Sequence, residues 1–252
     1  MRNLIVAAAA VLALGTALPA TAQPNAARDR ARIQVRLGEE DMRVEKWAEA
    51  ARNFQQAIDI DPSFEYAYYD LGRADMALKK YVDAIAAYTK SRALYEAQAG
   101  KQFSNAQDAQ RARREEITEI DDRIRSLQGL PQTVQTQDQL RQLQDYKRRR
   151  LEDISRGNNI TIEDSVPAWV SVALGSALFR AGHMQDAERE YKAAIEADAK
   201  TGEAHSNLAV VYLQTGRIEE AEKSVKAAEK AGFKVNPMLK EDIAARKKAG
   251  SN

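Results

Sequence analysis

Residues 37–54 read LGEEDMRVEKWAEAARNF, and one period later residues 71–88 read LGRADMALKKYVDAIAAY. The two stretches align without a gap, because Gly38 and Gly72 are 34 residues apart. The same order of small and large residues returns in LGSALFRAGHMQDAEREY, residues 174–191, and in LAVVYLQTGRIEEAEKSV, residues 208–225. Self-similarity at a fixed period of about 20 to 50 residues is typical of repeat proteins, in which each unit buries its apolar face by stacking on the next.

The spacing inside each unit predicts two packed helices joined by a turn. One set of small residues lets the second helix approach the first, and a second set does the same from the other side: Gly38, Gly72, Gly175 and Ala209, then Ala50, Ala84, Ala187 and Ala221. We expect the large side chains of Phe54, Tyr88 and Tyr191 to fill the space between neighbouring repeats. Gly182 and Gly216 stand where a turn with positive φ is expected.

These residues resemble the tetratricopeptide repeat family, whose unit of about 34 residues is a pair of antiparallel helices. The resemblance covers about half of the chain and implies an all-α superhelix that binds a protein or peptide partner. In this family the first helix of each repeat lines a concave groove, and the resemblance assigns the following residues to it: Tyr66, Tyr69, Arg73, Met76, Trp169, Val172, Ser176, Phe179, Glu203, Ser206 and Val210. The lysine and asparagine set with which some members clamp a C-terminal carboxylate is absent, so recognition of a chaperone tail is not expected.

Composition agrees with an all-α fold. Charged residues make up 30% of the chain and aromatic residues 6%, and only 12 glycines and 6 prolines interrupt its 252 residues. The dominant unbranched side chains lose little rotamer freedom in a helix, which favours helices over strands.

Residues 97–167 interrupt the period. Gly72 and Gly175 are 103 residues apart, which is 69 more than one period of 34. Two degenerate repeats would have this length, but they would place Thr118 and Glu152 at the small-residue position. Instead, an apolar seam with steps of three and four residues precedes the breaker Gly129-Leu130-Pro131 and resumes after it: Ile117, Ile120, Ile124 and Leu127, then Leu140 and Leu143. The stretch therefore predicts a coiled-coil-like helical hairpin with arms of about 30 residues.

Basic residues gather at one level of this hairpin, where Gln110 and Arg113 are expected to face Lys147 and Arg150. They are Arg111, Arg113, Arg114, Lys147, Arg148, Arg149 and Arg150. One interpretation is an anion-binding patch for lipid phosphates, glycan acids or an acidic partner. The other is a solvated helix surface neutralised by the interspersed acids, which is the more common meaning of such a pattern.

The N-terminus has the pattern of a signal peptide. Arg2 precedes an apolar run from Leu4 to Leu14, and the small residues 20–22 follow Pro19, so cleavage is expected after Ala22. The run is shorter than the roughly 20 residues of a spanning helix. The chain has no cysteine, which agrees with export to an oxidising compartment. We expect a periplasmic or secreted protein.

Without Arg2, the 38 basic residues become 37, equal to the 37 acidic ones, so the charge balance gives no global attraction to nucleic acid. Contact with a membrane surface is left open. The sequence has no phosphate-binding glycine loop, metal motif or nucleophile elbow, and His183 and His205 are isolated. We therefore expect no catalytic site, no metal and no cofactor.

The sequence thus predicts a signal peptide at 1–22, a repeat pair at 23–96, a hairpin insertion at 97–167, a second repeat pair at 168–235 and a capping helix at 236–252. The predicted function is an exported, non-enzymatic scaffold that holds a peptide or partner helix in its groove. The alternative is a structural component of the cell envelope that oligomerises, as a homodimer or with another coiled-coil protein, through the hairpin.

Overall fold

The computed structural model describes residues 24–99, 103, 105–155 and 166–250. Every regular element in these ranges is an α-helix. The helices are α1 (Pro24–Arg43), α2 (Trp47–Ile60), α3 (Glu65–Ala77), α4 (Tyr81–Gln98), α5 (Ala106–Gln128), α6 (Val134–Ser155), α7 (Ala168–Arg180), α8 (Met184–Ala197), α9 (Gly202–Gln214), α10 (Ile218–Lys230) and α11 (Pro237–Gly250). The predicted signal peptide lies outside the described residues, and within them no helix is long and apolar enough to cross a membrane.

Four helix pairs form the repeats: α1 with α2, α3 with α4, α7 with α8, and α9 with α10. A Cβ atom added to Gly38 would lie 2.5 Å from the Phe54 ring, and one added to Gly72 would lie 2.7 Å from the Tyr88 ring. These rings therefore pack against the glycine of their own repeat. The sequence predicted that they fill the space between neighbouring repeats; the structure adds the contact within the pair, where the missing side chain of the glycine leaves room for the ring.

The turns within the repeats share one backbone geometry but not one residue type. Gly182 and Gly216 have φ of +89° and +77°, as the sequence predicted. Glu45 and Lys79 stand at the equivalent turns of the first two repeats and also have positive φ, at 59° and 61°. The N-terminal repeats therefore hold non-glycine residues in a conformation that glycine adopts more readily.

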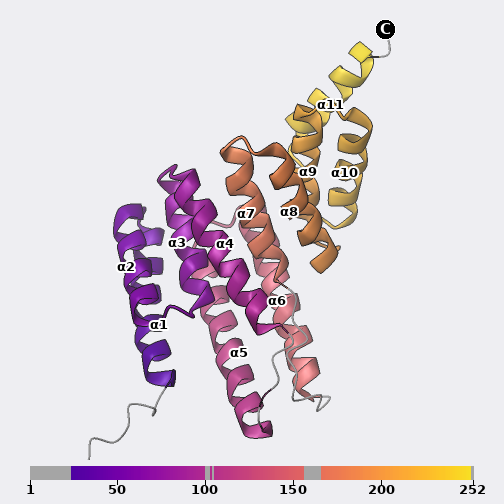
Figure 1. Ribbon diagram of the computed structural model, residues 1–252. Coiled ribbons are helices and arrows are strands. Elements are labelled where there is room, and N and C mark those ends of the chain that lie inside the picture. The colour runs from indigo at the N-terminus through magenta and orange to yellow at the C-terminus, as the bar shows by residue number, and fades with distance from the viewer. Residues whose placement is uncertain (1–23, 100–102, 104, 156–165, 251–252) are drawn as a thin grey trace, which may run out of the picture.

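The insertion separates the repeat pairs in sequence but not in space. Helix α4 packs directly on α7, so the four repeats form one continuous stack (Figure 1). Arg92 of α4 forms an ion pair with Glu190 of α8, and Arg180 of α7 donates a hydrogen bond of 2.7 Å to the Tyr81 hydroxyl.

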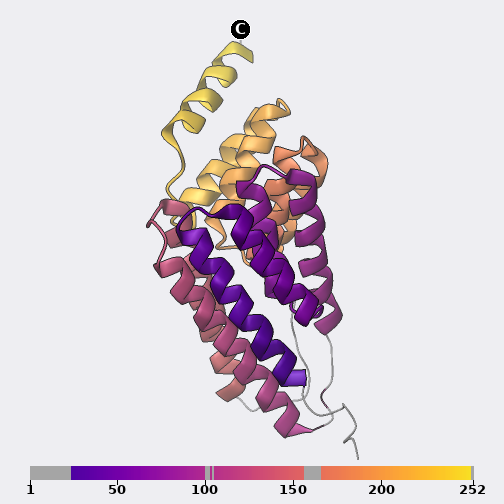
Figure 2. The ribbon, with the colours of Figure 1, turned by 90° about the vertical axis from the view of Figure 1, so that its left-hand side faces the viewer.

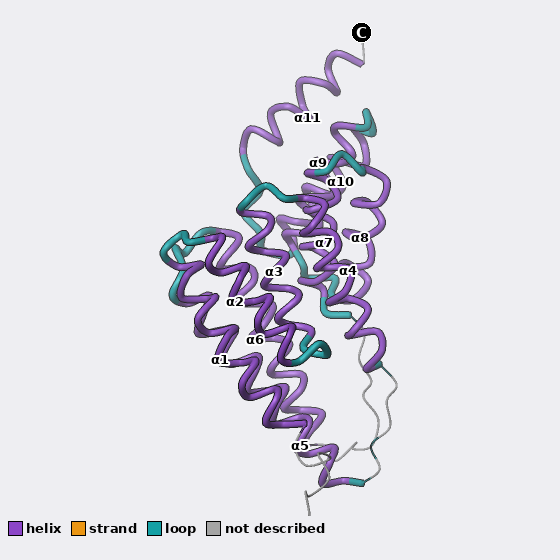
Figure 3. Tube along the Cα trace, turned by 60° about the vertical axis from the view of Figure 1, so that its left-hand side comes forward, coloured by secondary structure: helices purple, strands orange, loops and turns teal. Residues whose placement is uncertain are grey.

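Helices α5 and α6, which we call the hairpin, pack antiparallel on each other and lie along one side of the stack (Figures 2 and 3). Ile120, Leu127 and Leu143 of the predicted seam are buried. The arms contain 23 and 22 residues, fewer than the expected 30. The predicted facing of Gln110 and Arg113 with Lys147 and Arg150 was wrong.

Opposite charges meet at that level instead. Lys147 Nζ lies 2.5 Å from Asp121, and Arg150 Nε lies 2.8 Å from Glu116. The two arms are offset by a few residues from the alignment that the seam alone suggested, and this offset pairs each base with an acid.

Helix α11 closes the C-terminal end of the stack. The Asn236 side chain accepts a hydrogen bond of 3.0 Å from the Met238 amide, so Asn236 acts as the N-cap with Pro237 at the first helical position, as predicted. Leu239 and Ile243 are buried in the core of the last repeats. Lys247 reaches Glu222 of α10 at 2.5 Å.

Candidate binding surface

The first helix of each repeat, α1, α3, α7 or α9, takes part in one shared surface. We call the side of these helices that contacts the hairpin the inner face. Helix α5 lies against α1 and α3, whereas α6 lies against α7 and the start of α9. The surface that the family resemblance assigned to a binding partner therefore already carries a segment of the same chain.

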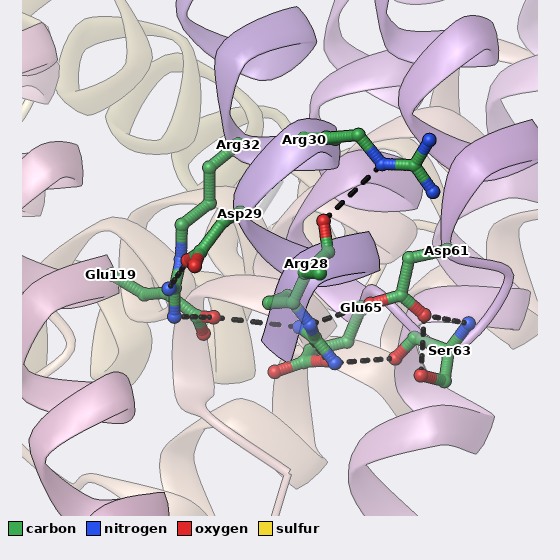
Figure 4. Close-up of polar contacts among 9 residues, drawn as sticks. Arg28, Asp29, Arg30, Arg32, Asp61, Ser63, Glu65 and Glu119 are labelled. Carbon is green, nitrogen blue, oxygen red and sulfur yellow. Dashed lines mark hydrogen bonds and ion pairs between the residues drawn. The ribbon is translucent and has the colours of Figure 1, made fainter. Parts of the chain in front are cut away.

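A cluster of buried charges joins α5 to the first two repeats (Figure 4). Glu119 of α5 lies 2.8 Å from Arg32 Nη2 and 3.4 Å from Arg28 Nη1. Arg28 also contacts Glu65 of α3 at 3.2 Å and Asp61 at 2.7 Å. One arginine of α1 thus connects α3, the turn before it and α5.

Burial governs the charge state of Glu119. Desolvation and the neighbouring Glu65 raise the pKa of Glu119 to about 8, although Arg28 and Arg32 favour its ionised form. Burial therefore makes Glu119 costly to ionise, and the two nearby guanidinium groups stabilise its ionised form.

The second buried contact of α5 is made by Arg123, whose side chain is 4% exposed. It forms an ion pair with Asp70 of α3 and lies over the Tyr69 ring, with 4.7 Å between the guanidinium carbon and the ring centroid. Burial disfavours the charge of Arg123, but Asp70 and Tyr69 outweigh it and raise its pKa. Glu39 of α1 stands 3.9 Å from Arg123, and burial together with the charge of Asp70 raises the pKa of Glu39 to about 7.

Helix α6 makes contacts of a different kind. The Tyr146 ring meets the Trp169 ring of α7 edge to face, with 5.0 Å between the centroids. Asp138 accepts a hydrogen bond of 3.3 Å from the Glu203 amide at the N-terminus of α9, where the helix dipole favours a negative charge. Arg149 reaches Asp198 at 3.5 Å from a half-exposed position.

The predicted groove residues divide into two groups in the structure. The first group lies at the hairpin or beside Asp70, the carboxylate that Arg123 binds. Its members are Tyr66, Tyr69, Arg73, Trp169 and Glu203. Those that the structure places in or beside the packing of the repeats are Met76, Val172, Ser176, Phe179, Ser206 and Val210. Ser176, for example, is within 3.2 Å of the Tyr191 hydroxyl of its own repeat.

The predicted anion patch is rich in acidic neighbours. Besides the pairs of Lys147 and Arg150 with α5, Arg148 contacts Asp145 at 2.7 Å and Arg111 contacts Asp108 at 2.5 Å. Arg149 pairs with Asp198, as described above, Arg113 is half-buried and Arg114 is exposed. This arrangement favours the interpretation of a solvated, neutralised surface.

Sequence reasoning missed Arg28, Arg32, Asp70, Glu119 and Arg123 as a unit. The signal was present, because Glu119 and Arg123 are four residues apart and flank Ile120 of the apolar seam. Their partners, however, lie 53 to 91 positions away in the chain, and nothing local identifies them. In the described ranges no group of three or more His, Cys, Asp or Glu residues is arranged to hold a metal ion.

Comparison with known proteins agrees with this architecture. The family profile described as Tetratricopeptide repeat matches residues 35–99 and 172–232, together half of the chain. This chain belongs to the tetratricopeptide repeat family. Members of the family are generally binding scaffolds for other proteins and not enzymes. The hairpin lies in the part of the chain that the profile does not match.

Several solved structures resemble the chain. One is the first TPR of Spaghetti (RPAP3) bound to the HSP90 peptide SRMEEVD, with 13% identity, a TM-score of 0.46, and coverage of 75% of this chain and 95% of that one. Another is PilW, a type IV pilus biogenesis factor, with 15% identity, a TM-score of 0.40 and 86% of each chain covered. YrrB, a TPR protein with an unusual peptide-binding site, has 17% identity and a TM-score of 0.28, over 86% of this chain and 92% of its own. No curated protein gives a significant match.

Proposed function

We propose that this protein is an exported, non-enzymatic scaffold that binds a partner helix or extended peptide on its inner face, in exchange for part of its own hairpin. The observation that carries the proposal is that the inner face already holds two amphipathic helices of the chain itself. These helices define the chemistry of an acceptable ligand: an aromatic ring for Trp169, a guanidinium for Asp70 and Tyr69, and a carboxylate for the start of α9.

Helix α6 is the arm that we expect a ligand to replace. Its polar and aromatic contacts with the repeats include one aromatic pair, one hydrogen bond and one half-exposed ion pair. Exposed ion pairs stabilise a protein by about 0–1 kcal/mol, so the Arg149–Asp198 pair adds little to the free energy that a ligand must replace. A ligand that offers an aromatic and an acidic side chain about two helical turns apart, as Tyr146 and Asp138 are, would compete for this position.

The experiment supplies the hairpin in trans. Residues 100–161 are replaced by a flexible Gly-Ser linker, and a labelled peptide comprising residues 106–155 is titrated against the product. We expect saturable binding in the micromolar range that Trp169→Ala weakens. If the deletion variant does not fold, the same peptide is titrated against the full chain carrying Tyr146→Ala, where the inner face is intact and the competing arm is weakened. Absence of binding to both proteins contradicts the proposal.

The natural partner and the compartment need their own measurements. A photoreactive amino acid at Ala173, one turn after Trp169 on α7 and partly buried, should crosslink a partner in cells, which mass spectrometry identifies. Fractionation of the same cells tests export, since the proposal expects a chain shortened at Ala22 in the periplasmic or secreted fraction. A full-length chain confined to the cytoplasm contradicts that part of the proposal.

The second candidate is a structural component that oligomerises through the hairpin, with basic residues that bind anions. It would require α5 and α6 to turn away from the repeats, because Ile120, Leu127 and Leu143 are already buried. Light scattering distinguishes the two functions. An oligomer that the hairpin deletion converts to monomer supports the second candidate, and salt-dependent binding to anionic vesicles that is lost in Arg148→Gln/Arg149→Gln/Arg150→Gln supports its anion site.

A further inference from the structure

Helix α1 has a second apolar stripe, on the side opposite to the one that packs in the protein. Successive steps of four, three, four, three and four residues give Ala26, Arg30, Ile33, Leu37 and Glu40 in α1 and Val44 in the turn directly after it, and all six are exposed. Ile33 is 48% exposed, Leu37 43% and Val44 62%. Alternating steps of three and four residues place these side chains on one narrow face, the arrangement by which two helices pair.

The other repeats show what such positions normally contact. The residues 34 positions after Ile33 and Leu37, and their counterparts in the third and fourth repeats, are Ala67 and Leu71, Val170 and Leu174, and Ala204 and Leu208. All of them are buried except Leu71, which is partly buried, since each first helix after α1 packs on the second helix of the preceding repeat. Among the described residues, α1 has no preceding repeat. The stripe is therefore a stacking surface without a partner.

The remaining sides of α1 are already occupied. Ala31, Val35 and Met42 are buried in the core, and Arg28 and Arg32 point to Glu119 of α5 (Figure 4). In Figure 2, which faces the N-terminal edge, α1 lies in the foreground beside α5. At the other end of the stack, α11 covers the last repeat. The molecule thus covers its C-terminal end and leaves the described N-terminal end open.

The stripe can pair with a second copy of itself that runs in the opposite direction. When a second copy of α1 is placed antiparallel about a two-fold axis at residue 35, Ile33 faces Leu37 of the second copy and Arg30 faces Glu40 of the second copy. Ala26 faces Val44 of the second copy in the same way. Apolar residues then meet apolar residues, and each base meets an acid, at both ends of the contact.

We propose that two copies of this protein associate through α1, antiparallel and related by a two-fold axis. The paired stripe spans about 27 Å at ~1.5 Å per residue. Arg36 lies beside the axis, near Arg36 of the second copy, where the two like charges repel each other. Substitution of Arg36 by an uncharged residue should therefore tighten the dimer. The local contacts of the stripe charges, Arg30 with the Ala26 carbonyl and Glu40 with Arg43 at 3.8 Å, are exposed and exchangeable.

The first test measures mass against concentration. The full chain is expressed with residues 1–22 and purified as the cells process it, and sedimentation equilibrium follows the monomer–dimer balance. We expect a dimer that Leu37→Glu weakens by more than about tenfold, because the charge would be buried between two apolar side chains. The matched control is Val82→Glu on the exposed surface of α4, where the side chain is 74% exposed, and it should leave the mass unchanged.

Charge reversal tests the orientation. Arg30→Glu and Glu40→Arg should each weaken the dimer, and the double variant Arg30→Glu/Glu40→Arg should restore it, because every acid again meets a base. A double variant weaker than either single one contradicts the antiparallel pairing. A wild-type chain that stays monomeric at all concentrations overturns the proposal, and so does a dimer that Leu37→Glu leaves intact while deletion of the hairpin dissociates it.

Discussion

The two arms of the hairpin contact the repeats by different physical means. Helix α5 meets α1 and α3 through buried charges, with Glu119 between Arg28 and Arg32, and Arg123 on Asp70. Helix α6 meets the C-terminal repeats through an aromatic pair, a hydrogen bond to the start of α9 and a half-exposed ion pair. Removing one member of a buried ion pair leaves the other charge without a partner, whereas an exposed contact can be lost with little change. The comparison shows that buried charge joins α5 to the N-terminal repeats, and it is the reason for proposing α6 as the arm that a ligand replaces.

The largest effect is expected at Arg123. Arg123→Met leaves the buried carboxylate of Asp70 with Arg73 alone, at 3.0 Å, and should lower the free energy of unfolding by about 3 kcal/mol, the low end for a broken buried pair. Urea denaturation followed by circular dichroism measures it. Arg125→Met is the matched control on the same helix, since Arg125 also pairs with an acid, Asp122, but is 69% exposed. A loss at Arg123 no larger than at Arg125 would mean that α5 is not held by buried charge.

The second effect is a dependence on pH through Glu39. Its pKa is about 7 in the folded protein and 4.5 without the fold, so between these values the folded chain keeps a proton that the unfolded chain has released. Raising the pH through this window removes that proton and lowers the free energy of unfolding. Thermal unfolding between pH 5 and 8 should therefore show a falling melting temperature, to which Glu119, with its pKa raised to about 8, also contributes. Glu39→Gln should make the decline shallower, and Glu39→Gln/Glu119→Gln shallower still. An equal slope in the variant would exclude Glu39 as its source.

The third effect concerns the aromatic contact of α6. Tyr146→Ala removes the ring from Trp169 and should cost about 2 kcal/mol, with amide hydrogen exchange accelerating in α6 before α5. Tyr146→Phe keeps the ring and loses only the hydrogen bond of 2.9 Å to Glu116, for which about 1 kcal/mol is expected. Equal acceleration in both arms would show that they leave the repeats together.

The smallest effect is expected at Asp138, which serves as an N-terminal acceptor for α9. Asp138→Ala should cost about 1 kcal/mol, as the loss of a helix cap does, and should speed exchange in the first turn of α9. Asp138→Asn retains an acceptor and should cost less. If the alanine variant leaves exchange at Glu203 unchanged, then α6 does not stabilise α9 through this contact.

The repeats could be predicted from the sequence because their packing is local. Gly38 and Gly72 have no side chain where an aromatic ring arrives from the same repeat, and this requirement recurs at a fixed spacing. The hairpin could be predicted from its apolar seam and its breaker. Its position on the inner face could not, because Glu119 and Arg123 resemble ordinary solvated helix charges until their distant partners are known. The offset between the two arms was also missed, because it depends on ion pairs between long charged side chains of α5 and α6 that no local pattern identifies.

The most direct measurement of the central claim uses the absence of cysteine from the chain. A Cβ atom added to Gly129 at the hairpin tip would lie 3.2 Å from the Cδ atom of Arg43 at the end of α1. In the double variant Arg43→Cys/Gly129→Cys, a short bismaleimide reagent should join the two positions within one chain, in high yield and identifiable by peptide mass. Single-cysteine variants control for links between chains. A hairpin that extends away from the repeats would give no intramolecular link, and that result would contradict its docking on the inner face.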